Sequence, residues 1–108
     1  MASGIIKGTS VEVINEYLRV RKNGNIVTVD VLTREITGGY EGWHSLGSLP
    51  AQYRPTYVIN GLLADNFVTT DANNNPIDVR ITTGGTVNIY LFADKLRVQP
   101  FGTITYII

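Results

Sequence analysis

Hydrophobic and polar residues alternate along this chain in short runs, with the period of a β-strand rather than that of a helix. In "IVTVDV", residues 26–31, the side chains of Val27, Val29 and Val31 fall on one face. Thr28 and Asp30 lie between them and therefore point to the other face. The pattern predicts a strand with one face in the core and one partly in water.

A hairpin is predicted just before this run. The dipeptide Asn23-Gly24 is typical of a type I′ turn, in which both central residues need a positive φ. The strand entering the turn is expected at about 17–22. Residues 1–15 are interpreted as an irregular lead-in or the remnant of a linker.

A second hairpin is predicted nearer the C-terminus. "IDVRI" (77–81) and "TVNIYL" (86–91) both alternate, "TTGG" turns the chain between them, and 98–108 form a last strand. Turn signals every 8–15 residues, including a polar turn at 69–76, favour an all-β fold. We therefore expect a single domain over residues 1–108, a compact β-barrel or jelly-roll-like sandwich of short antiparallel strands.

The C-terminal segment "TITYII" is apolar at positions that would face both sides of a strand, and no charge follows Arg97. Such a strand would aggregate if it were an exposed edge. Either it is central in its sheet, or another subunit covers it. The sequence leaves both alternatives open.

Composition excludes several classes of function. The chain has 108 residues, 44% hydrophobic and 17% charged, with nine basic residues balancing nine acidic ones. The charged fraction is low for a soluble monomer, where charged residues usually approach a quarter, which leaves room for a surface covered by a partner. No basic cluster is present, so neither nucleic acid nor an anionic membrane surface is an expected partner.

The chain offers little for metal or cofactor chemistry. It has no cysteine and one histidine, so no metal site and no cofactor are predicted. "DANNN" begins like a calcium loop, but Pro76 stands at the glycine position and Thr82 at the glutamate position. No secretion signal and no apolar run of about 20 residues is found, so no membrane insertion is expected.

Catalytic patterns are equally weak. His44 and Ser45 are neighbours on a predicted strand, where adjacent side chains point to opposite faces, so they make a poor nucleophile and base. Possible carboxylate pairs, Glu35 with Glu41 or Asp65 with Asp71, have no spacing that forces them together. A non-enzymatic protein is predicted.

A binding-type set of residues remains around "YEGWH". An aromatic ring covers the apolar face of a sugar, while carboxylate, imidazole and guanidinium groups bind its hydroxyls. The alternative interpretation places Trp43 in the core and Tyr53 beneath the proline-bounded loop. The candidate saccharide-binding residues are Tyr40, Glu41, Trp43, His44, Tyr53 and Arg54.

Three segments, "YLRVRKNGNIVTVDV", "GWHSLGSLPAQYRP" and "GTVNIYLF", resemble the C-terminal receptor-binding head of tail fibre and baseplate proteins from siphophages of Gram-positive bacteria. The resemblance covers roughly residues 15–108, and "LGSLPAQYRP" is its most specific part. It implies a β-barrel or jelly-roll-like head, a homotrimer at the tail tip of the virion, and binding of host cell-wall saccharides. Such proteins normally carry shoulder and stem regions, so the chain is expected to be an excised head or a small accessory tail protein.

The predicted function is therefore host recognition through a cell-surface polysaccharide, with other phage tail proteins as partners. The alternative is a structural tail or baseplate domain whose aromatic loop contacts another virion protein. A depolymerase is a third, less favoured class.

Overall fold

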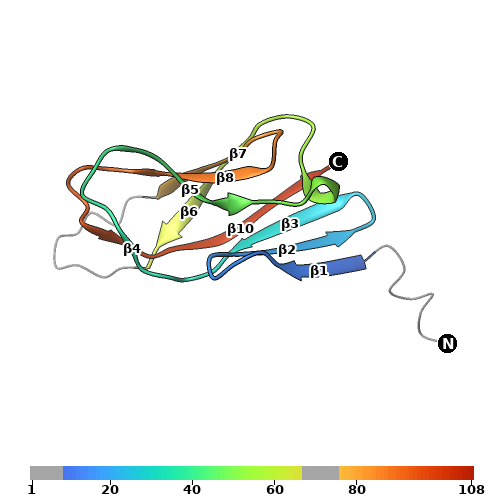
Figure 1. Cartoon of the computed structure of the whole chain (residues 1–108), viewed down its shortest axis with the longest axis horizontal. Helices are drawn as coiled ribbons and strands as arrows, with labels where there is room; N and C mark the ends of the chain where they lie inside the picture. The colour runs from blue at the N-terminus through green and yellow to red at the C-terminus, as the bar shows by residue number, and fades with distance from the viewer. Residues whose placement is uncertain (1–8, 67–75) are drawn as a thin grey trace.

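A computed structural model describes residues 9–66 and 76–108, and its regular elements are almost all β-strands (Figure 1). One 3-10 turn, η2 (Ala51–Tyr53), interrupts them. The strands are β1 (Thr9–Val13), β2 (Leu18–Asn23), β3 (Ile26–Val31), β4 (Ile36–Thr37), β5 (Gly42–Ser48), β6 (Ile59–Asp65), β7 (Ile77–Ile81), β8 (Thr86–Leu91), β9 (Arg97–Val98) and β10 (Pro100–Ile107).

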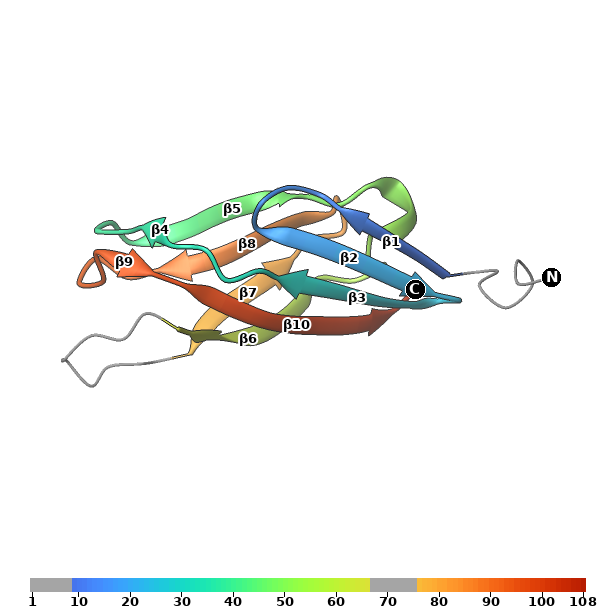
Figure 2. The same ribbon diagram turned by 90° about the horizontal axis from the view of Figure 1, so that it is seen from below.

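Eight of these strands form one antiparallel sheet in the order β1-β2-β3-β10-β6-β7-β8-β5, and β4 and β9 form a separate short pair. The large sheet curls into a half-barrel, which Figure 2 shows from the side of β10. The predicted all-β, barrel-like fold class is confirmed. Strands β1 and β5, which are distant in the sheet order, are its two edges.

The concave face of the half-barrel holds the core. Val27, Val29 and Val31 of β3 point into it, as the alternation predicted, and they are joined by Val79 and Ile81 of β7. These branched side chains suit the pleated surface on which they pack. The core also contains Leu18, Val20, Ile36, Leu46, Leu49, Tyr53, Leu63, Ile77, Val87, Ile89, Leu91, Val98, Ile104 and Tyr106.

The apolar C-terminal strand is central, which decides between the two alternatives for "TITYII". β10 pairs with β3 over 102–107 and with β6 over 100–101. Ile104 and Tyr106 point into the core, whereas Phe101 and Ile107 are exposed on the convex face. Hydrogen bonds to two neighbouring strands therefore protect its backbone along part of its length.

Two local predictions need correction. The hairpin turn comprises Gly24 and Asn25, since Asn23 already pairs with Ile26. Gly24 has a φ of +63° and no other residue of this turn has a positive φ, which fits a type II′ rather than a type I′ turn. Within the predicted irregular lead-in 1–15, residues 9–13 form β1, because their alternating "TSVEV" pairs with β2 in unbroken register.

The remaining predictions on the strands have mixed outcomes. The second hairpin is confirmed as β7 and β8, and the last strand as β10. Strand β6 was not predicted. The polar turn predicted at 69–76, with its calcium-like start, falls almost wholly on 67–75, outside the described residues.

Side chains join the two edges of the half-barrel. Asn15, in the β1–β2 loop, donates from Nδ2 to the Leu46 carbonyl of β5 at 2.8 Å. Its Oδ1 accepts the backbone N–H groups of Tyr17 and Leu18 at 2.8 and 3.0 Å. One amide side chain thus closes its own loop and attaches that loop to the opposite edge strand.

The segment after β5 makes a second attachment, centred on Tyr53. The Tyr53 side chain is 1% exposed, and its hydroxyl forms a 3.0 Å hydrogen bond with Ser10 Oγ of β1. Its carbonyl accepts a hydrogen bond from the Tyr106 hydroxyl of β10. Lys22 of β2 donates to the carbonyl of the preceding Gln52. The "LPAQYRP" segment therefore holds β5 against the β1–β2–β10 half of the sheet.

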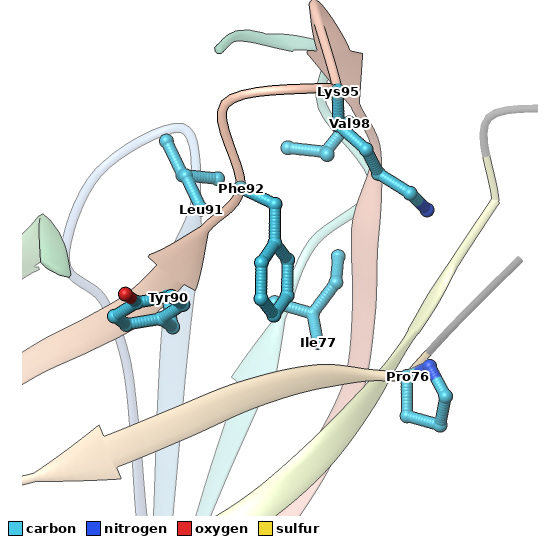
Figure 3. A pocket seen from close by; sticks show the side chains of 7 residues that line it. All are labelled: Pro76, Ile77, Tyr90, Leu91, Phe92, Lys95 and Val98. Atoms are coloured by element: carbon cyan, nitrogen blue, oxygen red, sulfur yellow. The ribbon is translucent and has the colours of Figure 1, made fainter. Parts of the chain in front are cut away.

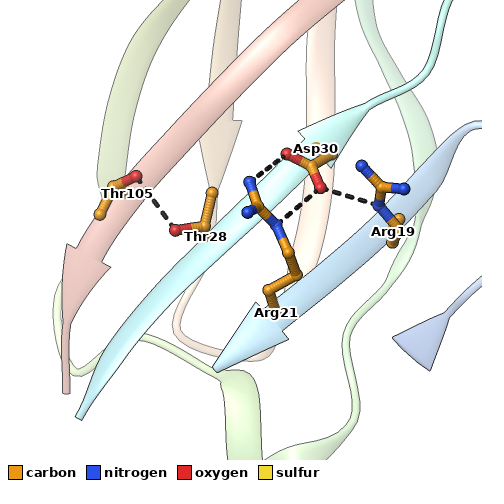
Figure 4. Close-up of polar contacts among 5 residues, drawn as sticks. All are labelled: Arg19, Arg21, Thr28, Asp30 and Thr105. Atoms are coloured by element: carbon orange, nitrogen blue, oxygen red, sulfur yellow. Dashed lines mark hydrogen bonds and ion pairs between the residues drawn. The ribbon is translucent and has the colours of Figure 1, made fainter. Parts of the chain in front are cut away.

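The convex face of that half carries a polar network (Figure 4). Asp30 is 5% exposed and accepts from Arg19 Nε at 2.9 Å and from both Nε and Nη2 of Arg21 at 3.1 and 3.0 Å. Beside it, the Thr28 and Thr105 hydroxyls are 3.3 Å apart. The two guanidinium groups satisfy the carboxylate and cover it from water.

Replacing Asn15 tests the attachment between the edges. Asn15→Ala leaves the Leu46 carbonyl and two loop N–H groups without their partner, so we expect the free energy of unfolding to fall by about 2 kcal/mol. Asn66→Ala, at an exposed position, is the control and should change stability by less than about 0.5 kcal/mol. Urea unfolding measures both values. Equal values for the two variants would contradict the attachment.

Tyr106 should make the stability of the protein depend on pH in the alkaline range. Burial raises the pKa of Tyr106 from 10.0 to about 12. Folding therefore favours the protonated phenol. This contribution is complete below about pH 10 and is lost as the pH rises towards about 12. Denaturation between pH 9 and 12 should show a flatter decline in Tyr106→Phe, at lower overall stability. Tyr57→Phe, at a 78% exposed ring, should keep the wild-type slope.

Candidate functional site

Three aromatic side chains form a continuous row on the convex face of β5 and β8. Trp43 and Tyr90 have ring centroids 5.3 Å apart at an interplanar angle of 81°. Tyr90 and Phe92 are 5.1 Å apart at 68°. Trp43 is 41% exposed and Phe92 39%. We call these three residues the aromatic ridge. Its edge-to-face contacts fix the rings relative to one another while leaving much of their surface open to water.

Strand register places the ridge. Trp43 is directly opposite Tyr90 in the β5–β8 pair, so both point to the same face. Phe92 follows Tyr90 by two residues and shares that face. Ile89 and Leu91, the alternate positions of β8, are fully buried and anchor the strand. The ridge residues of β8 are thus fixed in place by the buried residues directly next to them in the chain.

Polar groups flank the Trp43 end of the ridge. The Arg80 guanidinium lies 4.3 Å from the centre of the indole ring, in cation–π geometry, and its Nε donates to Asn60 Oδ1 at 3.4 Å. Just before β5, Glu41 Oε2 accepts a hydrogen bond from the Tyr90 hydroxyl at 3.2 Å. Partial desolvation, followed by the Glu41 carboxylate, raises the pKa of Tyr90 above its ordinary value of 10.0.

A small apolar pocket lies at the Phe92 end (Figure 3). In this view the Phe92 ring lies near the centre of the pocket, next to Ile77, and Pro76 lies lower, just before the start of β7. Lys95 also lines the pocket, and its ammonium group is paired with Asp65 at 3.0 Å. The pocket extends the apolar surface of the ridge beyond the end of β8. Its lining is Pro76, Ile77, Tyr90, Leu91, Phe92, Lys95 and Val98.

The structure divides the six residues predicted as a saccharide site. Trp43 belongs to the aromatic ridge, and Glu41 accepts a hydrogen bond from the Tyr90 hydroxyl of that ridge. Tyr40 and His44 form a separate pair, with the Tyr40 hydroxyl 2.7 Å from His44 Nδ1. His44 is opposite the buried Ile89, so it points to the concave side of β5, away from Trp43. The four candidate residues within "YEGWH" therefore do not form one site, because Trp43 and His44 point to opposite faces of β5.

The other two predicted residues, Tyr53 and Arg54, have structural positions. Tyr53 is buried, so it cannot shape a ligand cleft, and the interpretation that it packs beneath the proline-bounded loop is the one found. Arg54 is exposed, but its Nε donates to the Leu49 carbonyl at 3.0 Å. Its side chain crosses Gly85, where a Cβ would lie 2.9 Å from Arg54 Cγ. We remove Tyr53 from the candidate site and assign Arg54 to bracing this loop.

Sequence reasoning missed Arg80, Tyr90 and Phe92. All three stand directly next to a buried position in the alternating runs "IDVRI" and "TVNIYLF", which marks them as outward-facing. An aromatic at such a position was the available signal. What the sequence could not supply was the pairing of β5 with β8, which brings Trp43 beside Tyr90 from 47 positions away.

Comparisons with known proteins add no identity: no family model matches the chain, and a search of curated proteins finds no relative. In residues 9–66 and 76–108, no cluster of three or more acidic or imidazole side chains could hold a metal ion. No helix in the described part of the chain is long and apolar enough to cross a membrane.

The stability of two variants tests whether Trp43 is exposed and Tyr53 buried, as the structure places them. Trp43→Ala removes a largely exposed ring and one aromatic contact, so we expect a loss of about 1 kcal/mol. Tyr53→Ala removes a fully buried ring and its hydrogen bonds, for a loss of about 4 kcal/mol. Chemical denaturation measures both. A larger loss for Trp43→Ala than for Tyr53→Ala would show that their burial is assigned the wrong way round.

Proposed function

We propose that this protein is a non-catalytic recognition domain of a phage tail, and that it binds host cell-wall saccharides along the aromatic ridge. The observation that carries the proposal is the row of Trp43, Tyr90 and Phe92 on the convex face of the sheet, in which Trp43 and Phe92 are exposed and Tyr90 is half-buried. The phage context comes from the sequence resemblance.

The chemistry of the ridge suits a polymer of sugar rings. Flat aromatic surfaces accommodate the apolar C–H face of a pyranose. The Arg80 guanidinium and the Asn60 amide can donate to ring hydroxyls, and Glu41 can accept from them. Arg80 covers one face of the indole, so a sugar would contact the remaining exposed surface of Trp43 and the neighbouring rings.

The positions of the candidate catalytic groups support binding without catalysis. Ser45 is one position along β5 from His44 and points to the opposite face. The His44 Nδ1 is occupied by the Tyr40 hydroxyl. Glu41, the carboxylate bonded to the ridge, is engaged with Tyr90. We therefore favour recognition over polysaccharide cleavage.

A saccharide titration tests the proposal. Trp43 is the only tryptophan, so its fluorescence should shift on addition of cell-wall polysaccharide from Gram-positive bacteria. Trp43→Ala and Tyr90→Ala, followed by calorimetry, should each weaken binding tenfold or more, equivalent to about 1.4 kcal/mol. Tyr57→Ala, at a 78% exposed ring outside the ridge, is the matched control and should bind as wild type.

Two outcomes of that experiment would reject the proposal. Unchanged affinity in a folded Trp43→Ala variant would place the site elsewhere. Failure of every polysaccharide to bind would favour the structural alternative, a tail or baseplate domain whose convex face contacts another virion protein. Shortening of the polysaccharide during prolonged incubation would instead indicate a depolymerase.

A further inference from the structure

The apolar pocket at the Phe92 end of the aromatic ridge has a buried floor and an exposed rim. Pro76 and Phe92 are exposed at the rim, and the half-buried Tyr90 connects the pocket to the ridge. The floor consists of buried side chains that belong to the core: Ile77, Leu91 and Val98. A group that enters the pocket from the ridge therefore contacts core side chains.

The one charged side chain of the lining does not turn its charge towards the pocket. Lys95 Nζ lies 3.0 Å from Asp65 Oδ2, and the Asp65 side chain is 2% exposed. Asp65 is itself fixed by the Gln99 N–H, which donates to Oδ1 at 3.0 Å. Figure 3 shows the Lys95 nitrogen directed away from the Phe92 ring. The hydrocarbon stem of Lys95 is left to line the pocket, which thus presents an apolar and uncharged surface.

Contacts in the surrounding elements hold the pocket in shape. The Phe92 ring packs edge-to-face on Tyr90, with centroids 5.1 Å apart, and the Phe92 carbonyl accepts the Lys95 N–H at 3.1 Å. On the floor, Val98 is paired with Ile36 in the short β4–β9 ladder. Rim and floor are therefore fixed relative to one another, so a ligand meets a pocket that is already formed.

The size of the pocket limits what it can take. It has room for about one group of the size of a water molecule or a methyl group. A water molecule is retained in such a space only where several polar groups surround it, and this lining supplies few. A methyl group fills the same space without losing a hydrogen bond. Size and polarity therefore favour a methyl group and exclude a whole sugar ring.

We infer that this pocket is a specificity subsite of the ridge, which takes a methyl group carried by a sugar ring lying on Tyr90 and Phe92. The inference rests on the proposed function. Two kinds of sugar carry such a group, an N-acetylated sugar at the end of its acetamido group and a 6-deoxy sugar at C6. A hydroxyl group in the same place would lack a hydrogen-bond partner, so the matching hydroxylated sugar is disfavoured.

Matched oligosaccharides test the subsite. N-acetylated chitotetraose and cellotetraose differ only in an acetamido or a hydroxyl group at C2, whereas oligosaccharides of L-rhamnose and of L-mannose differ only in a methyl or a hydroxymethyl group. Calorimetry should show that the methyl-bearing member of one pair binds roughly tenfold more tightly than its partner. The pair that shows this difference identifies the source of the methyl group.

The same titrations separate failure of the inference from failure of the proposed function. Equal affinities within both pairs would overturn the subsite and leave saccharide binding in place. Binding of cell-wall polysaccharide without binding of either methyl-bearing oligosaccharide would also overturn the subsite alone. Absence of binding by every saccharide, the polysaccharide included, would reject both.

Filling the pocket tests its role from the side of the protein. Val98→Ile adds one methylene group at the floor, so the affinity ratio within the discriminating pair should fall from about ten to about one. Val58→Ile makes the same change at a 50% exposed position outside the pocket lining, and this matched control should keep the ratio. An unchanged ratio in a folded Val98→Ile variant would overturn the inference.

Nuclear magnetic resonance of the wild-type protein covers the case in which Val98→Ile does not fold. Intermolecular nuclear Overhauser effects should connect the methyl protons of the tighter-binding oligosaccharide to the methyl groups of Ile77 and Val98. Effects from those protons to the Trp43 indole, with none to Ile77 or Val98, would place the methyl group outside the pocket and contradict the inference.

Discussion

Closure of the half-barrel by side chains is the constraint on which the rest of this structure depends. The backbone ladder ends at β1 and at β5, and no hydrogen bonds between these strands complete a barrel. Asn15 and Tyr53 cross the opening instead. Each of these two residues forms hydrogen bonds with more than one partner. Removing either one therefore leaves polar groups near the core without a hydrogen bond. These two residues therefore connect the two edges that the backbone ladder leaves unpaired.

This closure also explains why the aromatic ridge is held firmly although it lies beside an edge. β5 would be free on one side, but the Leu46 carbonyl and the Tyr53 segment fix its C-terminal half, and β8 fixes the other side. A rigid aromatic surface loses little conformational entropy when it binds. The convex face of the β2–β3 half differs, because its arginines are already paired with Asp30. The aromatic ridge therefore offers a ligand more accessible surface than the convex face of β2 and β3.

Much of the fold follows from the alternation of residue types, and the departures have physical reasons. Val27 to Val31 and the β7–β8 hairpin needed only the two-residue period. The strand at 9–13 was missed because its own residues are all exposed, so the sequence holds no core-facing signal for it. The Asn23-Gly24 turn was displaced by one residue because Asn23 pairs in the ladder.

The candidate site was less predictable than the fold. "YEGWH" identified Glu41 and Trp43, but local sequence could not reveal that β8 supplies Tyr90 and Phe92, since that depends on a pairing between distant strands. Local sequence could not show which of the two aromatic residues, Trp43 beside Gly42 or Tyr53 between Pro50 and Pro55, is buried. Their burial differs because one lies on η2 inside the closure and the other on the convex face of β5.

The claim that the ridge is the ligand-binding face is tested most directly by nuclear magnetic resonance with an isotope-labelled protein. Trp43 supplies the only indole N–H signal, and the Arg80 Nε–H beside it is a second reporter on the same face. On addition of cell-wall polysaccharide, we predict that these signals and the amides of β5 and β8 shift together in a saturable manner. Shifts confined to Arg19, Arg21 and Thr105, with the indole signal unmoved, would contradict the account.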